Sequence, residues 1–429
     1  QAARARWPFV CTWDDHEFSN DNYQSYSTYG STRVLEAQRK RDANQAWFEF
    51  IPTVLDELRD QDAHGFRDAE LGRGADADNI AARDTLRIYR QLRWGQYVDI
   101  VLTDTRSYRS APPLEDGFSA SLGLPLDPVT LVEIADAGRA YNNGEPPATL
   151  PYGDGTVPNP AVDRDPGTLL GDEQRQWFLD TLSASDAPWK LWGNALPIIP
   201  MRLDMSRLPF TGYEDAIFNT DAWAGYPHEQ RLLMTHLENN GVTGVVSLSG
   251  DHHMHGAGSI NRSASEPDAP GVIVDFTVAG IASSPLFGDL YETARVDHPD
   301  FGTLVYRATD AGIEPVWNMT LLQGVLSSFT YNSTGFKGLA DWLGPNAANP
   351  GLAHVDTTSN GYGLASFDAG ECRVQFVSLE DCRAASDTPP AVYYRTHFTL
   401  PLWQAGQSPV LAAPEFDGPP PFPFGPATV

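Results

Sequence analysis

Short apolar runs that end in polar residues recur along the chain. Residues 8–13 and residues 244–248 are apolar runs of strand length, and residues 88–102 predict two strands joined by a turn at Gly95. Each run leads directly into a cluster of charged or amide side chains. Because α/β proteins place their sites at the ends of strands, these polar clusters are the first places to look for chemistry.

Helical patterns separate these runs. Residues 33–60, 172–183 and 227–240 predict helices, and the alternation of strand and helix through residues 90–255 predicts an α/β fold. The later apolar runs read mostly as strands without helices between them, which predicts an antiparallel second sheet. These runs are residues 272–278, 303–307, 364–367, 373–379 and 392–400.

Two segments stand out by composition. Residues 110–168 are rich in Pro, Gly, Asp and Asn, and we expect them to form a long surface insertion. Residues 413–429 form a Pro-rich tail that we expect to lie extended on the surface. The remainder, residues 1–412, is expected to be one catalytic domain that contains the insertion.

Charge narrows the choice of partners. The 429 residues are 41% hydrophobic, enough for a large core, and the formal net charge is −27. A surface this acidic repels nucleic-acid backbones and anionic membranes, so no nucleic-acid partner is expected. Without a run of about 18 apolar residues, no membrane span is expected either. A phosphate-bearing substrate would need local positive charge from metal ions or Arg.

The sequence leaves open whether two of the three cysteines form a disulfide. Cys372 and Cys382 flank an alternating segment, and a disulfide between them would suit an oxidising compartment. Cys11 would then remain as a buried thiol.

The first cluster with chemical potential follows the run at residues 8–13. It holds three carboxylates, an imidazole and an amide: Asp14, Asp15, Glu17, His16 and Asn20. Carboxylates this close repel one another unless a cation neutralises them, and oxygen ligands with an imidazole suit a metal ion. The alternative is a polar turn with a capping Asp and a hydrogen-bonded His.

The second cluster follows the run at residues 244–248. If the chain is extended there, Asp251, His253 and His255 point to one side and His252 to the other. A carboxylate and two imidazoles on one face would form half of a metal site, and the alternative is a hydrogen-bonded surface loop. Together the two clusters predict a two-metal hydrolase, in which cations activate a water and stabilise the leaving oxygen.

The ordered motifs resemble the alkaline phosphatase D family of the metallophosphoesterase superfamily. Asp14-Asp15-His16-Glu17 followed by Asn20 resembles the family's WDDHE…N block, and Ser249-Gly-Asp251 with His253 resembles its SGDxH block. Further blocks agree in order over residues 46–52, 87–109 and 171–194, so the match runs to about residue 285 and more loosely beyond.

The resemblance implies a fold, a metal centre and a reaction. The fold would be an α/β four-layer sandwich of two mixed β-sheets flanked by helices. The centre would hold two or more metal ions, iron with calcium, with zinc, manganese and magnesium as alternatives. The reaction would be hydrolysis of phosphate monoesters or diesters by a secreted or periplasmic enzyme.

The resemblance also assigns roles to residues. His16 takes the catalytic position, and Arg106 either binds the phosphate or forms a structural salt bridge. Asp15 and Asn20 compete for one ligand position, and the role of His255 is the least defined. The candidate metal ligands are Asp14, Asp15, Asn20, Asn194, Asp251, His253 and His255.

One departure concerns the start of the chain. The family's first metal-binding blocks lie upstream of the DDHE motif, and only thirteen residues precede Asp14 here. We therefore expect the N-terminal part of the fold to be missing from this chain and to come from a companion polypeptide of the same precursor. The alternatives to a phosphoesterase are an inactive metal-binding or structural protein of the same fold, and a hydrolase of sulfate esters.

Overall fold

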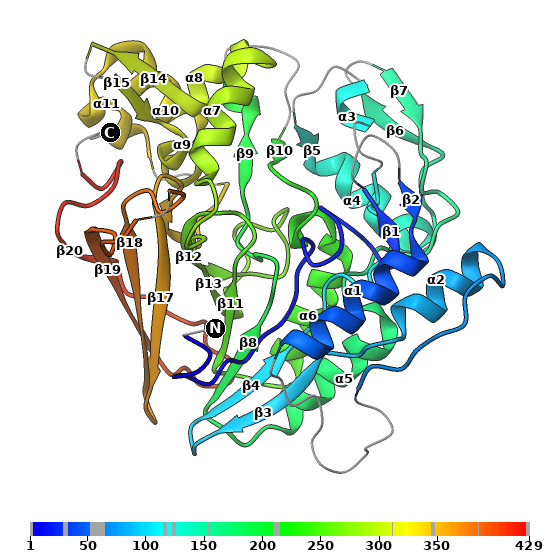
Figure 1. Ribbon diagram of the computed structural model, residues 1–429. Coiled ribbons are helices and arrows are strands. Elements are labelled where there is room, and N and C mark those ends of the chain that lie inside the picture. Colours follow the sequence, from blue (N-terminus) through cyan, green and yellow to red (C-terminus); the bar gives the residue numbers. More distant parts are fainter. Residues whose placement is uncertain are drawn as a thin grey trace. The chain divides into compact units, whose positions relative to one another are not determined.

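The computed structural model describes residues 3–28, 33–51, 65–114, 118–121, 126–152, 155–208, 215–310, 312–344, 348–384 and 386–425. The chain divides into two compact units. Unit 1 contains Gln1–Ala111 and Gly167–Ala195, and unit 2 contains Pro112–Pro166 and Leu196–Val429. Both units combine helices with a mixed sheet, so the predicted α/β class is confirmed (Figure 1).

Unit 1 is built on three strands. Their order is β8 (Trp189–Gly193), β4 (Val98–Leu102) and β3 (Arg90–Trp94), with β4 parallel to β8 and antiparallel to β3. The predicted turn at Gly95 is confirmed, and that residue has a φ of 63°. The helices are α1 (Ala37–Phe50), α2 (Ala75–Arg83) and α5 (Gly171–Ala184), beside a short pair β1 (Tyr26–Ser27) and β2 (Val34–Leu35).

Unit 2 contains a mixed sheet of four strands. In spatial order they are β16 (Leu352–Asp356), β12 (His255–Ile260), β13 (Ile273–Thr277) and β11 (Val245–Ser249). β11 runs parallel to β13, and the other pairs are antiparallel. The predicted strand at 244–248 and the predicted helix at 227–240, α6 (Pro227–Asn239), are both confirmed.

A second sheet in unit 2 covers the first. Its order is β17 (Asn360–Phe367), β18 (Glu371–Leu379), β19 (Val392–Pro401) and β20 (Glu415–Asp417), and every pair is antiparallel. Phe276 of the first sheet packs on Phe376 and Phe398 of the second, with ring centroids 6.1 and 5.6 Å away. The antiparallel sheet predicted from the residue pattern is confirmed, whereas the resemblance had implied a mixed one.

Helices fill part of the region that was read as strands only. They are α7 (Leu286–Val296), η4 (Pro299–Phe301), α8 (Gly302–Val305), α9 (Trp317–Gln323), α10 (Val325–Thr334) and α11 (Lys337–Leu343), with a hairpin of β14 (Tyr306–Thr309) and β15 (Gly312–Pro315). Val316, Met319, Tyr331 and Ala340 pack into one buried cluster. The prediction of mostly strands was wrong here, because α8, α9 and α11 span only four to seven residues, which is too short for a clear helical period. The longer helix α7 does have apolar residues at helical spacing, and the prediction overlooked it.

The described parts of the segment 110–168 form helices and strands. It holds α3 (Phe118–Ser121), β5 (Asp127–Pro128), α4 (Val129–Ala137), η1 (Gly138–Asn143), β6 (Thr149–Tyr152) and β7 (Gly155–Pro158). α4 buries seven of its nine residues, and β5 pairs with β10 (Asp215–Ile217), which pairs with β9 (Arg202–Asp204). The short turns η2 (Met205–Arg207) and η3 (Trp223–Gly225) complete this part of unit 2.

The Pro-rich tail is anchored. β20 pairs with β19, and Phe422 is 3% exposed beside Tyr331 at a ring distance of 5.1 Å. Cys372 and Cys382 are both free, so the disulfide considered above is absent. Strand β18 occupies residues 371–379 and holds the chain extended between them, which separates the two thiols. No described helix is long and apolar enough to span a bilayer.

Candidate metal centre

The loop that carries Asp14 and Asp15 is a fixed turn in unit 1. Its first residue, Trp13, is 2% exposed and packs edge-on against Trp47 of α1 at 5.4 Å. The carbonyl oxygen of Asp15 accepts hydrogen bonds from the amides of Phe18 and Ser19, both at 2.8 Å. A buried aromatic anchor and two backbone hydrogen bonds therefore define the conformation of the turn.

Asp14 is oriented by a buried arginine. The Nε atom of Arg106, a residue with 0% exposure, donates to Oδ1 of Asp14 at 2.7 Å. Arg106 follows β4, and Oδ1 of Asp104 accepts its backbone amide at 3.0 Å, which fixes the turn from which Arg106 extends. Of the two roles expected for Arg106, the structure has the salt bridge.

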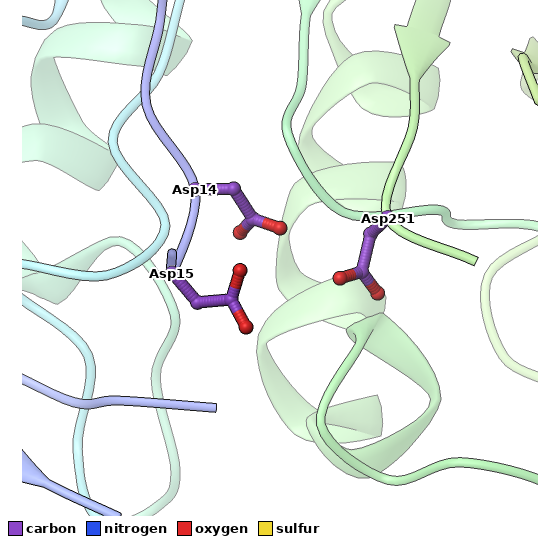
Figure 2. A group of neighbouring side chains, drawn as sticks. All are labelled: Asp14, Asp15 and Asp251. Atoms are coloured by element: carbon purple, nitrogen blue, oxygen red, sulfur yellow. The ribbon is translucent and has the colours of Figure 1, made fainter. Parts of the chain in front are cut away.

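Asp15 is held by the backbone. Its Oδ1 accepts the amide of His16 at 2.8 Å, and its Oδ2 accepts the amide of Asp21 at 2.9 Å. Asp15 is 5% exposed, and carboxylate oxygens of Asp14 and Asp15 lie within 4.8 Å of each other (Figure 2). Two carboxylates this close favour a cation between them.

His16 faces the solvent although its neighbour is buried. Its side chain is 70% exposed, and its Nε2 atom lies 3.9 Å from Oδ2 of Asp15. Glu17 turns back on the loop, where its Oε2 atom accepts the amide of Asp14 at 3.1 Å. Desolvation raises the pKa of Glu17, and the negative charges of Asp14 and Asp15 act in the same direction.

The two candidate asparagines belong to the same unit. Asn20 donates from Nδ2 to Oδ2 of Asp21 at 2.7 Å and is half-buried. Asn194 directly follows β8 and is 2% exposed. A side chain directly after a strand is in the place where α/β proteins put functional groups, so Asn194 stays a candidate.

The turn that carries Asp251 and His253 lies in unit 2, and the expected extended conformation is wrong. Asp251 has a φ of 61° and His253 a φ of 50°, both in the left-handed region that ordinary side chains seldom adopt. Strand β12 begins only at His255. Figure 2 shows the carboxylate of Asp251 on this turn. Backbone strain of this kind is concentrated at functional sites, which keeps the turn a candidate ligand segment.

His255 lies apart from that turn, in the core between the two sheets of unit 2. It is 0% exposed, its ring stacks on Phe376 at 4.7 Å, and its Nδ1 accepts the amide of Ala279 at 3.3 Å. Burial lowers the pKa of His255 to about 4. The surroundings of His255 are those of a core residue, so the alternation that put it on one face with Asp251 and His253 does not hold.

A buried aspartate next to the strand that precedes the Asp251 turn was not among the predicted site residues. Asp275 on β13 accepts hydrogen bonds from Oγ of Ser249 at 3.2 Å and Oγ1 of Thr277 at 2.8 Å. Burial raises the pKa of Asp275 to about 6. Because Ser249 ends β11, these bonds hold the strand from which Asp251 emerges. A lone Asp in the apolar run 272–278 was the signal available in the sequence.

The donor set fits a metal ion. In unit 1, Asp14 and Asp15 each offer a carboxylate oxygen, and in unit 2 the turn at Asp251 offers a carboxylate and the imidazole of His253. The oxygens of Asp15 are directed by backbone amides, and that of Asp14 by a guanidinium. Oxygen donors with one imidazole suit hard or borderline cations such as calcium, iron or zinc.

The turn at Asp251 follows β11, whereas the turn at Asp14 follows residues 8–13, which form no strand, so the strand predicted there is wrong. Turns that present carboxylates in this way offer the oxygen ligands that a metal-assisted hydrolase uses. The chain belongs to the PhoD-like phosphatase family, which matches residues 1–311. Both motifs, the turn at Asp14 and the turn at Asp251, lie within the matched residues.

Two individual proteins are similar to this chain. Alkaline phosphatase D of Bacillus subtilis (strain 168) is 24% identical over 261 residues, which cover 61% of this chain and 33% of the relative. A solved structure titled "Structure of PhoD" matches 95% of this chain and 56% of its own, with a TM-score of 0.54 and 16% identity. The chain thus spans a third of the curated relative's length and about half of the solved chain's. At 16% identity, the match to the solved structure shows a similar fold.

Proposed function

We propose that this chain hydrolyses phosphate esters with metal ions held by its acidic turns. The observation that carries the proposal is the pair Asp14 and Asp15, whose oxygens lie within 4.8 Å of each other in a turn fixed by hydrogen bonds. Membership of the PhoD-like phosphatase family supports the reaction class.

The proposed ligands come from both motifs. Asp14, Asp15 and Asp251 contribute carboxylates, His253 contributes an imidazole, and Asn20 and Asn194 contribute amide oxygens. The proposed ions are two or more, iron with calcium. When bound, such ions lower the pKa of a water and stabilise charge on the phosphoryl oxygens. They also offset the net charge of −27, which otherwise repels a phosphate ester.

The proposed role of His16 is proton transfer. Its ring is 70% exposed, so a substrate can reach it, and its Nε2 atom lies 3.9 Å from Oδ2 of Asp15. An imidazolium at this place donates a proton to the leaving oxygen of the ester. Arg106 is buried and acts on Asp14, so we assign it the orientation of that ligand.

Hydrolysis of two chromogenic esters tests this function. Purified protein should hydrolyse bis-p-nitrophenyl phosphate or p-nitrophenyl phosphate, lose the activity on chelation, and regain it with added iron or calcium. The ratio of the two rates decides between diesterase and monoesterase. Activity that survives exhaustive chelation, or no activity on either ester with any added metal, would contradict the proposal. Faster hydrolysis of p-nitrophenyl sulfate would indicate a sulfate esterase.

The proposed location is outside the cytoplasm. The strongly acidic composition and the relation to an alkaline phosphatase support secretion into the medium or the periplasm. Fractionation of the producing cells with a cytoplasmic marker enzyme tests this location, and recovery with the marker would contradict it.

A further inference from the structure

A buried lysine lies beneath the turn that carries Asp14 and Asp15. Lys40 belongs to α1 and is 3% exposed. Its Nζ atom lies 4.6 Å from the ring centroid of Trp13 and 5.6 Å from that of Phe18. These two aromatic residues flank the segment 14–17, so one ammonium group contacts both ends of the acidic turn. All of these groups belong to unit 1.

The ammonium group also faces charges from neighbouring elements. Asp104, after β4, and Glu17 of the turn favour its charged form, whereas Arg106 opposes it. Burial is the largest influence and lowers the pKa of Lys40 to about 8. Two buried cations, Lys40 and Arg106, therefore stand beneath the carboxylates of the turn.

An apolar side chain at position 40 would cost less free energy to bury than the ammonium group of a lysine. Burying an ammonium group is unfavourable, and a hydrophobic residue of similar size is often neutral or stabilising in exchange. The contacts with two aromatic faces recover part of that cost, because cations are attracted to the faces of aromatic rings. The carboxylate partners of the ammonium group are Asp104 and, in the acidic turn, Glu17, which Asp14 and Asp15 repel, so the charge of Lys40 offsets part of the negative charge of the turn.

We propose that Lys40 is a positioning residue for the candidate metal centre. Its ammonium group contacts the rings of Trp13 and Phe18 and offsets the negative charge of Glu17, which lies between them in the sequence. The turn then keeps the conformation in which Asp14 and Asp15 present their oxygens together before a metal ion arrives. Lys40 itself is buried and touches no substrate. The part of this inference that concerns metal affinity rests on the proposed function, and the part that concerns the turn does not.

Amide hydrogen exchange of the metal-free protein tests the conformational part. The amides of Phe18 and Ser19 donate to the carbonyl of Asp15 at 2.8 Å, so their exchange rates report on the turn. Lys40→Met keeps the apolar stem but removes the charge, and it should accelerate exchange at both amides. Lys40→Arg keeps the charge and should restore slow exchange.

Lys190 provides a matched control. It is another lysine of unit 1, 8% exposed on β8, with a pKa lowered by burial and with Asp99 and Asp186 as its charged neighbours. Lys190→Met should leave exchange at Phe18 and Ser19 unchanged. An equal effect of both methionine variants, or no effect of Lys40→Met, would show that Lys40 is an ordinary buried residue.

Titration of the same proteins with Ca²⁺ or Fe²⁺ tests the second part. Loss of a direct outer partner of a metal ligand costs roughly ten- to a hundredfold in affinity, and because Lys40 acts on the ligands only through the turn, Lys40→Met should weaken binding by at most about tenfold. Lys40→Arg and Lys190→Met should bind as the natural protein does. Unchanged or tighter binding by Lys40→Met would overturn the inference. A natural protein that binds no metal would contradict the proposed function, while the exchange result would still decide the role of Lys40 in the turn.

Discussion

Asp14 and Asp15 are neighbours in sequence with different surroundings. Asp14 is oriented by the guanidinium of Arg106, and Asp15 by the backbone amides of His16 and Asp21. These hydrogen bonds fix the direction in which each carboxylate presents its oxygens, so the pair is arranged to receive a cation. His16 adds an exposed imidazole at the edge of the same turn.

Replacement of His16 should separate proton transfer from metal binding. Because the side chain is 70% exposed, His16→Ala should leave folding intact. The variant should lose about 100- to 10,000-fold in kcat, the range of general acid catalysis, and keep its metal content. Kinetics and elemental analysis of the same sample check this. An equal loss of metal and turnover would make His16 a ligand.

The residue types of the site could be predicted from the sequence, but part of its geometry could not. The DDHE cluster after an apolar run indicated the turn that is present. The positive φ values of Asp251 and His253 depend on tertiary structure, so the alternation argument wrongly grouped His255 with them. Asp275 and Lys40 were overlooked because their importance comes from neighbours distant in the sequence.

Between the two sheets of unit 2, a second imidazole is buried without a polar partner. His354 on β16 is 0% exposed, and neither ring nitrogen has a hydrogen bond. Its ring stacks on Phe424 at 5.4 Å and contacts Phe398 at 5.7 Å. Burial lowers the pKa of His354 to about 3. The imidazole is therefore neutral in the folded protein and must stay so for the sheets to pack.

The folded chain should consequently become less stable as the pH is lowered. The unfolded chain binds a proton at His354 below its ordinary pKa of 6.5, while the folded chain binds it only near pH 3. Stability is lost as the pH falls through this window, by about 2 kcal/mol between pH 7 and pH 5. His354→Phe should remove that part of the loss. Urea unfolding at both pH values measures it, and an unchanged pH dependence would contradict the assignment.

The C-terminal tail should contribute strongly to stability. Phe422 is 3% exposed in the cluster with Tyr331. Nδ2 of Asn318 donates a hydrogen bond to the carbonyl oxygen of Phe422 at 2.9 Å. Phe422→Ala should lower the free energy of unfolding by about 3–5 kcal/mol, the usual range for a buried phenylalanine. Val410, which is 72% exposed, serves as the control, and Val410→Ala should change it by less than about 0.5 kcal/mol. Equal effects would show that the tail is not anchored.

Helices and strands with a strong apolar pattern could be predicted from the sequence, whereas those that depend on tertiary packing could not. The hairpin around Gly95, helix α5 and strand β11 have clear apolar periods with turn residues at their ends. Helix α4 lies within a Pro- and Gly-rich segment, where composition outweighed the apolar run at residues 129–137. The short helices α8, α9 and α11 depend on tertiary packing, which a single sequence does not show.

At the scale of the whole molecule, the proposed ligands come from both compact units. Asp14, Asp15 and Asn20 belong to unit 1, and Asp251 and His253 belong to unit 2. The match to the PhoD-like phosphatase family spans residues of both. A bound metal ion stabilises the folded state that holds it, so metal removal should lower the thermal stability as well as the activity.

The metal content of four purified proteins tests the central claim most directly. Inductively coupled plasma mass spectrometry should find two or more metal equivalents in the natural chain and a clear loss in Asp15→Ala and in Asp251→Ala. Glu49→Ala, which removes an exposed carboxylate of α1, serves as the control and should keep the full content. A natural chain without bound metal, or full content in both aspartate variants, would contradict the account.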